Sequence, residues 1–109
     1  MYDKYGQFIG GKWQKSASGE TYDVINPATE EVIGKASKAN SSDVQKALKS
    51  AEKGLQIWKN TSPWERSKII RKISDLIRKR VDVLSKWLTF EVGKPLTEGP
   101  GEIGGAADI

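Results

Sequence analysis

Residues 99–104, GPGEIG, match the G-x-G-x-x-G spacing of loops that hold the pyrophosphate of a dinucleotide. Glycines suit such a loop because the backbone must turn sharply and approach the phosphate closely. The loop works only between a strand and a helix, with an acidic side chain about 20 residues further on. Here the segment follows a predicted helix stop at residues 93–95, GKP, and the sequence ends at Ile109. We therefore interpret residues 99–104 as a glycine-rich helix start that packs closely against another element.

Other residue types limit the chemistry further. The chain contains no cysteine and no histidine, so it offers no thiol nucleophile, no imidazole base and none of the usual zinc ligands. Disulfide bonds are excluded for the same reason. The neighbouring carboxylates Glu30 and Glu31 fall in a predicted turn, where we expect them to be solvated rather than paired as a general acid and base. The sequence therefore predicts no catalytic and no cofactor-binding residue.

A cluster of basic side chains supplies most of the formal net charge of +4. Its members are Arg66, Lys68, Arg71, Lys72, Arg78, Lys79 and Arg80. Such a cluster could bind nucleic acid or anionic lipid. However, its members occupy the faces that an isoleucine stripe leaves open on a predicted amphipathic helix, and no reading motif or exposed aromatic is recognisable beside them. We favour a helix surface that faces solvent or a partner protein, with nucleic-acid binding as the weaker alternative.

Two β-hairpins are predicted within residues 7–37. The pair Gly10-Gly11 accepts positive φ at both positions and would join strands at residues 7–9 and 12–14. In the second hairpin, Pro27 fixes φ and Asn26 can bond its own backbone, which predicts a turn between residues 21–25 and 32–36.

From Ser41 onward the hydrophobic spacing becomes helical. Ser42 and Gln45 form a capping-box pattern for a helix over about residues 43–58. A second helix, over 63–80, has three start signals in Ser62, Pro63 and Glu65. Its apolar stripe is expected to be buried and consists of Ile69, Ile70, Ile73, Leu76 and Ile77.

A third helix is expected over residues 82–92, followed by a stop at a glycine and a proline. A further helix starts within residues 97–109, although each interior glycine weakens it by about 1 kcal/mol.

Length and composition bound the class of protein. A chain of 109 residues is normally one domain at most. Because a small domain buries only about 60 to 70% of its unfolded surface, its core is expected to be thin. With 37% hydrophobic and 29% charged residues it is expected to fold and to be soluble. No stretch approaches the roughly 18 apolar residues of a transmembrane helix, and residues 1–6, MYDKYG, are not a signal peptide. We expect a cytoplasmic protein, and since Ile109 follows no cap, turn or polar tail, a fragment of a longer chain.

Several motifs in a fixed order make the sequence similar to a known family. They are FIGGKW at residues 8–13, NPATEEVIG at 26–34, the Asp43-Val44 start of a helix ending at Trp58, PWER at 63–66 and EVGKP at 91–95. Together they resemble the N-terminal part of the NAD(P)-dependent aldehyde dehydrogenase superfamily across nearly the whole chain. The resemblance implies an α/β fold, in which residues 1–109 are a partial N-terminal segment of a cofactor-binding domain. That segment would comprise two β-hairpins followed by three to four helices, packed on a dinucleotide-binding sheet that comes later in the chain.

The resemblance also implies an activity for the full-length enzyme, the oxidation of an aldehyde to a carboxylic acid with NAD or NADP. In the family a cysteine thiolate attacks the aldehyde, a hydride passes to the nicotinamide, and a glutamate activates the water that hydrolyses the thioester. All of these groups lie beyond residue 109 in the family's order. We therefore expect the chain alone to be inactive and to bind no dinucleotide.

Two further features follow from the resemblance. Family members often bind a structural Na⁺ or K⁺ through backbone carbonyls before the Asn-Pro turn and an acidic residue before the Gly-Lys-Pro stop. The corresponding residues are Val24, Ile25 and Glu91, and the site needs another carbonyl from beyond this chain. Residues 97–109 correspond to a helix that lines the substrate tunnel, with Ala106 near a tunnel-facing position.

Three hypotheses about function stay open at this point. The first is the N-terminal portion of an aldehyde dehydrogenase, whose partner is the rest of that chain in a homo-oligomer, with no membrane contact. The second is a free-standing remnant that acts as a structural or interaction module. The third is a basic helical module that binds nucleic acid.

Overall fold

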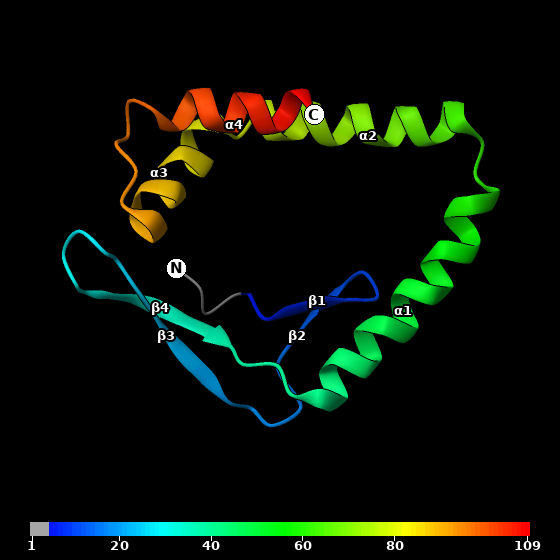
Figure 1. Ribbon diagram of the computed structural model, residues 1–109, viewed down its shortest axis with the longest axis horizontal. Helices are drawn as coiled ribbons and strands as arrows, with labels where there is room; N and C mark the ends of the chain where they lie inside the picture. The colour runs from blue at the N-terminus through cyan, green and yellow to red at the C-terminus, as the bar shows by residue number, and fades with distance from the viewer. Residues whose placement is uncertain (1–4) are drawn as a thin grey trace. The chain divides into compact units, whose positions relative to one another are not determined.

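The computed structural model describes residues 5–109 and divides into two compact units (Figure 1). Unit 1 comprises the chain up to Ile25 together with Val32–Asn60, and unit 2 comprises Asn26–Glu31 and Thr61–Ile109. The sequence predicts that residues 1–6 are not a signal peptide, and residues 1–4 of this segment lie outside the described residues. None of the helices among residues 5–109 is long and apolar enough to cross a membrane.

The first hairpin of unit 1 pairs β1 (Gln7–Ile9) with β2 (Lys12–Gln14) in antiparallel register, as the sequence predicts. Its two-residue turn has φ values of 62° and 78°, which glycine adopts without steric cost. Phe8 stands opposite Trp13, and their ring centroids are 5.0 Å apart. Tyr5 adds an edge-to-face contact with Trp13 at 5.1 Å, so an aromatic cluster stabilises this short hairpin.

The second hairpin pairs β3 (Thr21–Ile25) with β4 (Val32–Ser37), one residue longer at its end than expected. Val24 stands opposite Gly34 and Ile25 opposite Val32, so the register shifts between them. The extra residue on β4 is a bulge, which interrupts the hydrogen-bonded ladder next to the turn.

Helix α1 spans Ser41–Asn60 and contacts β1 within unit 1. It is two residues longer at each end than the predicted 43–58. The predicted capping box at Ser42 and Gln45 is wrong, because Asn40 is the N-cap: its Oδ1 accepts from the Asp43 N–H at 3.1 Å. The Asp43 carboxylate in turn accepts from the Asn40 N–H at 3.1 Å. The N–H groups of Asn40 and Asp43 at the helix start are thus each satisfied by the side chain of the other residue.

Unit 2 contains three helices, α2 (Pro63–Arg78), α3 (Val81–Val92) and α4 (Gly99–Asp108). In Figure 1, α4 lies alongside α2, and α4 also packs on α3. The predicted capping box of α2 is confirmed, since the Ser62 hydroxyl accepts from the Glu65 N–H and the Glu65 carboxylate accepts from the Ser62 N–H. Helix α2 ends two residues before the predicted boundary at 80.

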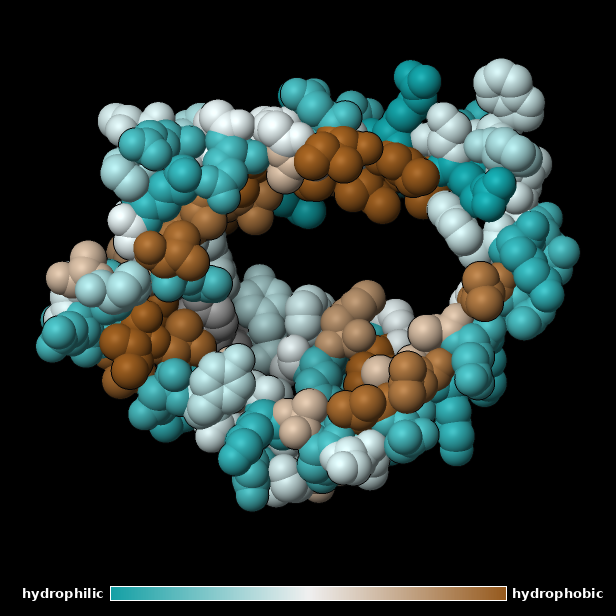
Figure 2. Space-filling model, viewed as in Figure 1, coloured by the Kyte–Doolittle hydropathy of each residue, from teal (hydrophilic) through white to brown (hydrophobic). Residues whose placement is uncertain are grey.

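Hydrophobic burial is sparse in both units. Among the hydrophobic side chains of residues 5–109, only Ala107 is buried. The expectation that the stripe of α2 is buried is wrong: Ile69, Ile70 and Ile73 are each about half exposed. Figure 2 shows hydrophobic side chains uncovered over α2. The amphipathic pattern of this helix therefore has no covering element within unit 2.

Candidate functional site

The turn that joins β3 to β4 is a closed hydrogen-bonded loop built on Asn26, which is buried. The side-chain Oδ1 of Asn26 accepts from the Ala28 N–H at 2.9 Å. Its backbone N–H donates to the Glu31 carbonyl at 2.9 Å, and its carbonyl accepts from the Glu30 N–H at 2.8 Å. Glu30 takes a positive φ of 58°, a backbone conformation that is uncommon for residues other than glycine. Glu30 and Glu31 are both exposed.

The same turn meets the end of α3. Gly93 closes that helix with φ of 70°, and its N–H donates to the Thr89 carbonyl at 2.9 Å. A Cβ at Gly93 would lie 3.3 Å from the Cγ atom of Pro27, which is tighter than most contacts between such atoms. Two motifs that are far apart in the sequence, NPATEEVIG and EVGKP, are therefore in contact within unit 2.

The three residues predicted to bind a monovalent cation lie in different units. Val24 and Ile25 end β3 in unit 1, whereas Glu91 is in the last turn of α3 in unit 2. The bulge next to Val24 disturbs the ladder, which suits backbone carbonyls that serve as oxygen ligands. Among the described residues no group of three or more acidic, histidine or cysteine side chains could hold a metal ion. The cation site stays a prediction.

A buried carboxylate that sequence analysis missed is Asp43, which is 3% exposed. It accepts from the Ala17 and Asn40 N–H groups, each at 3.1 Å, and from the Gln7 side-chain amide at 3.2 Å. Burial raises the pKa of Asp43, but the two backbone hydrogen bonds oppose it. The Gln7 amide and the positive charge of Lys46 act in the same direction as those bonds, so the pKa lies below its ordinary value. Asp43 thus joins α1 to both β1 and the loop before β3.

The glycine-rich segment 99–104 begins α4 and follows a turn rather than a strand. Gly99 is buried, and a Cβ built on it would lie only 2.7 Å from the Cβ atom of Ser85. Ser85 is 2% exposed, and its hydroxyl donates to the Val81 carbonyl of its own helix at 2.7 Å. The interpretation of this segment as a closely packed helix start is confirmed.

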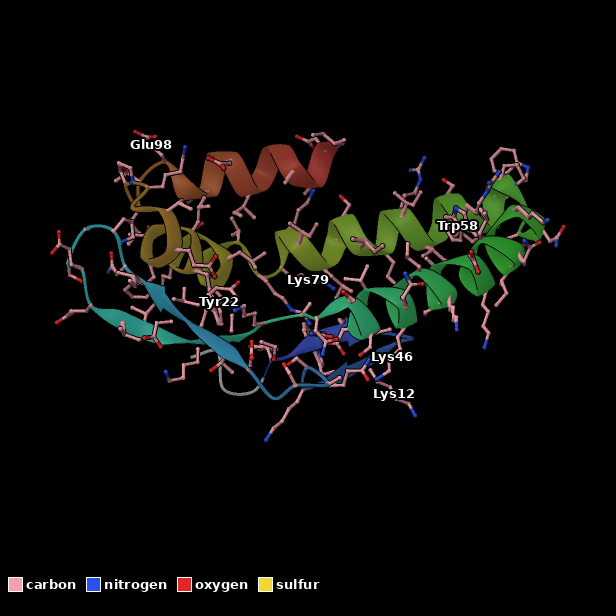
Figure 3. All side chains as sticks on the ribbon, turned by 60° about the horizontal axis from the view of Figure 1, so that its bottom comes forward. Lys12, Tyr22, Lys46, Trp58, Lys79 and Glu98 are labelled. Atoms are coloured by element: carbon pink, nitrogen blue, oxygen red, sulfur yellow. The ribbon has the colours of Figure 1, made fainter. Side chains whose placement is uncertain are left out.

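Lys94, in the turn after α3, is held by two carboxylates. Its Nζ atom lies 2.6 Å from Glu102 and 3.6 Å from Glu98, and its side chain is 28% exposed. Figure 3 labels Glu98 beside the start of α4. The hydrogen bond and the charge of Glu102 raise the pKa of Lys94, with a further contribution from the charge of Glu98.

Two hollows in the described part of the chain are lined partly by charged side chains. The hollow in unit 1 is lined by Trp13, Lys15 and Lys35, among others, and Lys35 pairs with Asp23 at 2.6 Å. The hollow in unit 2 lies between α2 and α4, and its charged lining is Arg66, Arg71 and Asp108. Neither lining places a nucleophile beside a base.

Comparison with known proteins identifies the family. The family model described as "Aldehyde dehydrogenase family" matches residues 13–109, most of the chain. This chain belongs to the aldehyde dehydrogenase family. The resemblance inferred from the sequence motifs is thereby confirmed.

Aldehyde dehydrogenase relatives match over nearly the whole chain. A putative aldehyde dehydrogenase of Staphylococcus epidermidis is 46% identical over 91 residues, 84% of this chain and 19% of the relative. A putative aldehyde dehydrogenase of Staphylococcus aureus is 43% identical over 97 residues, 89% of this chain and 20% of the relative. The chain therefore spans about a fifth of the length of these curated relatives.

Solved structures agree with the fold described above. The crystal structure of an NAD-dependent aldehyde dehydrogenase from Sinorhizobium meliloti superposes with a TM-score of 0.91 at 38% identity, covering 95% of this chain and 21% of that one. The α/β assignment, two β-hairpins followed by helices of an aldehyde dehydrogenase N-terminal part, is confirmed.

Proposed function

We propose that the chain is the N-terminal portion of an NAD(P)-dependent aldehyde dehydrogenase, the parent enzyme, which oxidises an aldehyde to a carboxylic acid. The observation that carries this proposal is a family match over residues 13–109 in a chain that spans about a fifth of its relatives. The chemistry of the parent enzyme needs a thiolate nucleophile, and these 109 residues contain no cysteine. The role of this segment is therefore structural.

The uncovered apolar faces support that role. Along α1, Val44, Leu48 and Leu55 are each about half exposed, and the isoleucines of α2 are similarly exposed. Large exposed apolar patches mark surfaces that bind another protein surface. We assign the rest of the aldehyde dehydrogenase chain as that partner, with the apolar stripe of α2 packed on the dinucleotide-binding sheet.

The remaining parts of the proposal concern the parent enzyme. It would use NAD or NADP, work in the cytoplasm and assemble as a homo-oligomer, and α4 would line its substrate tunnel. A Na⁺ or K⁺ ion would be bound by the carbonyls of Val24 and Ile25 and by the Glu91 carboxylate. Hard monovalent cations prefer such oxygen ligands, which is why these residue types fit the ion.

A chimera tests the proposal. Residues 13–109 would replace the matching segment of the Staphylococcus epidermidis relative, and NADH formation would be measured with a panel of aldehydes. We expect the chimera to be active, and Ile73→Asp on the apolar stripe of α2 to abolish activity. Lys72→Asp, on the charged face of the same helix, is the matched control and should leave activity largely unchanged.

The isolated chain provides the complementary measurement. It should form no NADH from any aldehyde and should not bind NAD in calorimetry. Aldehyde oxidation by the isolated chain would refute the structural role, and a folded chimera that tolerates Ile73→Asp would refute the proposed packing of α2.

A further inference from the structure

Helix α4 is built from residues that form helices poorly. Four of its ten residues are glycines, and Pro100 stands near its start. Each interior glycine lowers the helix-forming equilibrium by about fivefold relative to alanine. Glu98, at the N-cap position, makes no side-chain capping hydrogen bond. The local sequence therefore does not explain why this segment is helical.

Contacts with α3 and with the turn after it hold the start of α4. Gly99 packs directly against Ser85, as described above. Lys94 bridges Glu98 and Glu102, one helical turn apart at the start of α4, and we call these three side chains the Lys94 clasp. Carboxylates in the first turn also interact favourably with the helix dipole, so the clasp and the dipole act together.

Contacts with α2 hold the other end of α4. The Ser74 hydroxyl donates to the Ala107 carbonyl at 2.6 Å, and the Arg78 guanidinium pairs with the Asp108 carboxylate. Ala107 is the buried side chain of this contact. Helix α4 is thus attached at both ends through polar groups of its neighbours.

We propose that α4 is a conditionally ordered helix, which is helical only while it is docked on α2 and α3 and which unfolds separately from them when the Lys94 clasp is broken. Segments with weak local propensity and few buried apolar contacts open at a lower free energy than the core that they pack on. The Gly99 contact fixes where α4 docks, because no larger residue fits against Ser85. The clasp determines how long it stays docked.

Hydrogen exchange of the backbone amides in the full 109-residue chain tests this inference. Lys94→Met keeps the aliphatic stem but removes the charge, and it should speed exchange in α4 by about threefold to fivefold. In the wild type, α4 should exchange at a lower free energy of opening than α2 and with a weaker dependence on urea concentration. Lys94→Arg should restore slow exchange, and Lys68→Met on the exposed face of α2 is the matched control.

Glycine substitutions provide an independent test that does not weaken any contact. A Cβ at Gly104 or Gly105 meets no atom within 4 Å, so alanine there raises helix propensity at no steric cost. Gly104→Ala and Gly105→Ala should each slow exchange in α4 by up to about fivefold and should compensate for Lys94→Met.

Two results would overturn the inference. One is exchange in α4 that does not respond to the added alanines, since docking would then not be limited by helix propensity. The other is exchange in α2, α3 and α4 of the wild type at one common free energy of opening and with one common dependence on urea concentration, since the three helices would then unfold together.

Discussion

Replacing Gly99 by alanine should destabilise unit 2, although alanine is the better helix former. The added Cβ would lie 2.7 Å from the Cβ atom and 3.1 Å from the Cα atom of Ser85. Carbon atoms in contact are normally about 3.5 to 4.0 Å apart, so the overlap is near 1 Å with the Cβ atom of Ser85 and smaller with its Cα atom in the backbone of α3. Overpacking of this kind costs about 1–3 kcal/mol. Alanine recovers at most about 1 kcal/mol of helix propensity, and less at the first helical position.

A double-mutant cycle isolates the contact. Ser85→Gly alone should cost about 1 kcal/mol, because it places a glycine within α3 and removes the hydrogen bond to Val81. In the double variant Ser85→Gly/Gly99→Ala the clash with the Cβ atom is gone. We therefore expect the double variant to be more stable than the sum of the two single effects by about 1 kcal/mol or more.

Urea unfolding followed by far-ultraviolet circular dichroism measures these free energies. Gly104→Ala is the control, since its Cβ meets open space and it should be neutral or stabilising. Additive effects in the cycle, or a Gly99→Ala variant as stable as Gly104→Ala, would show that α4 does not approach α3 as closely as described.

Four further changes test other parts of the structure. The pKa of Asp43 is lowered in the fold, so its carboxylate stabilises the fold at a pH above its ordinary pKa of 3.8 and loses that contribution as the pH falls through the lower folded pKa. The melting temperatures of the wild type and Asp43→Asn should therefore converge in acid, and a constant difference from pH 2 to 7 would contradict this. The pKa of Lys94 is raised in the fold, so its contribution to stability is present below its ordinary pKa of 10.5 and is lost as the pH rises through the folded pKa. Lys94→Met should therefore melt at a lower temperature than the wild type at pH 7, and the difference should close in strong alkali. Ser62→Ala removes the N-cap of α2 and should cost about 1 kcal/mol in urea unfolding, whereas Ser62→Asp should cost little. Gly93→Ala should cost about 1–2 kcal/mol because of its positive φ, and Gly93→Asn should cost less if the left-handed conformation is the cause.

Local signals predicted most of the secondary structure. Two glycines at the first turn and an Asn-Pro pair at the second each determine the backbone of a few residues, so the sequence alone indicates the hairpins. The start of α2 was predictable for the same reason, since Ser62, Pro63 and Glu65 act on one another across a single turn. At these positions donor and acceptor lie within a few residues of each other, so sequence spacing is sufficient to predict the hydrogen bonds.

Prediction failed where the partner is distant in the sequence, and where a helix face has no covering element within its own unit. The role of Asp43 depends on Gln7 and Ala17, which no local pattern connects to it, although the spacing of Asn40 and Asp43 could have indicated the capping box. The isoleucine stripe of α2 is a correct amphipathic pattern, but nothing in unit 2 covers it. An amphipathic pattern predicts which face of a helix is apolar, but whether that face is buried depends on the elements that pack against it.

The motifs that identify the family coincide with positions where the backbone allows few residue types. Asn26 satisfies three hydrogen bonds of one turn, and Gly93 combines a positive φ with a close approach to Pro27 in that same turn. Because Gly93 lies against Pro27 of this turn, a change in either motif would disturb both. The family is therefore recognisable from this segment, since its sequence is constrained by the geometry that joins a hairpin turn to a helix end.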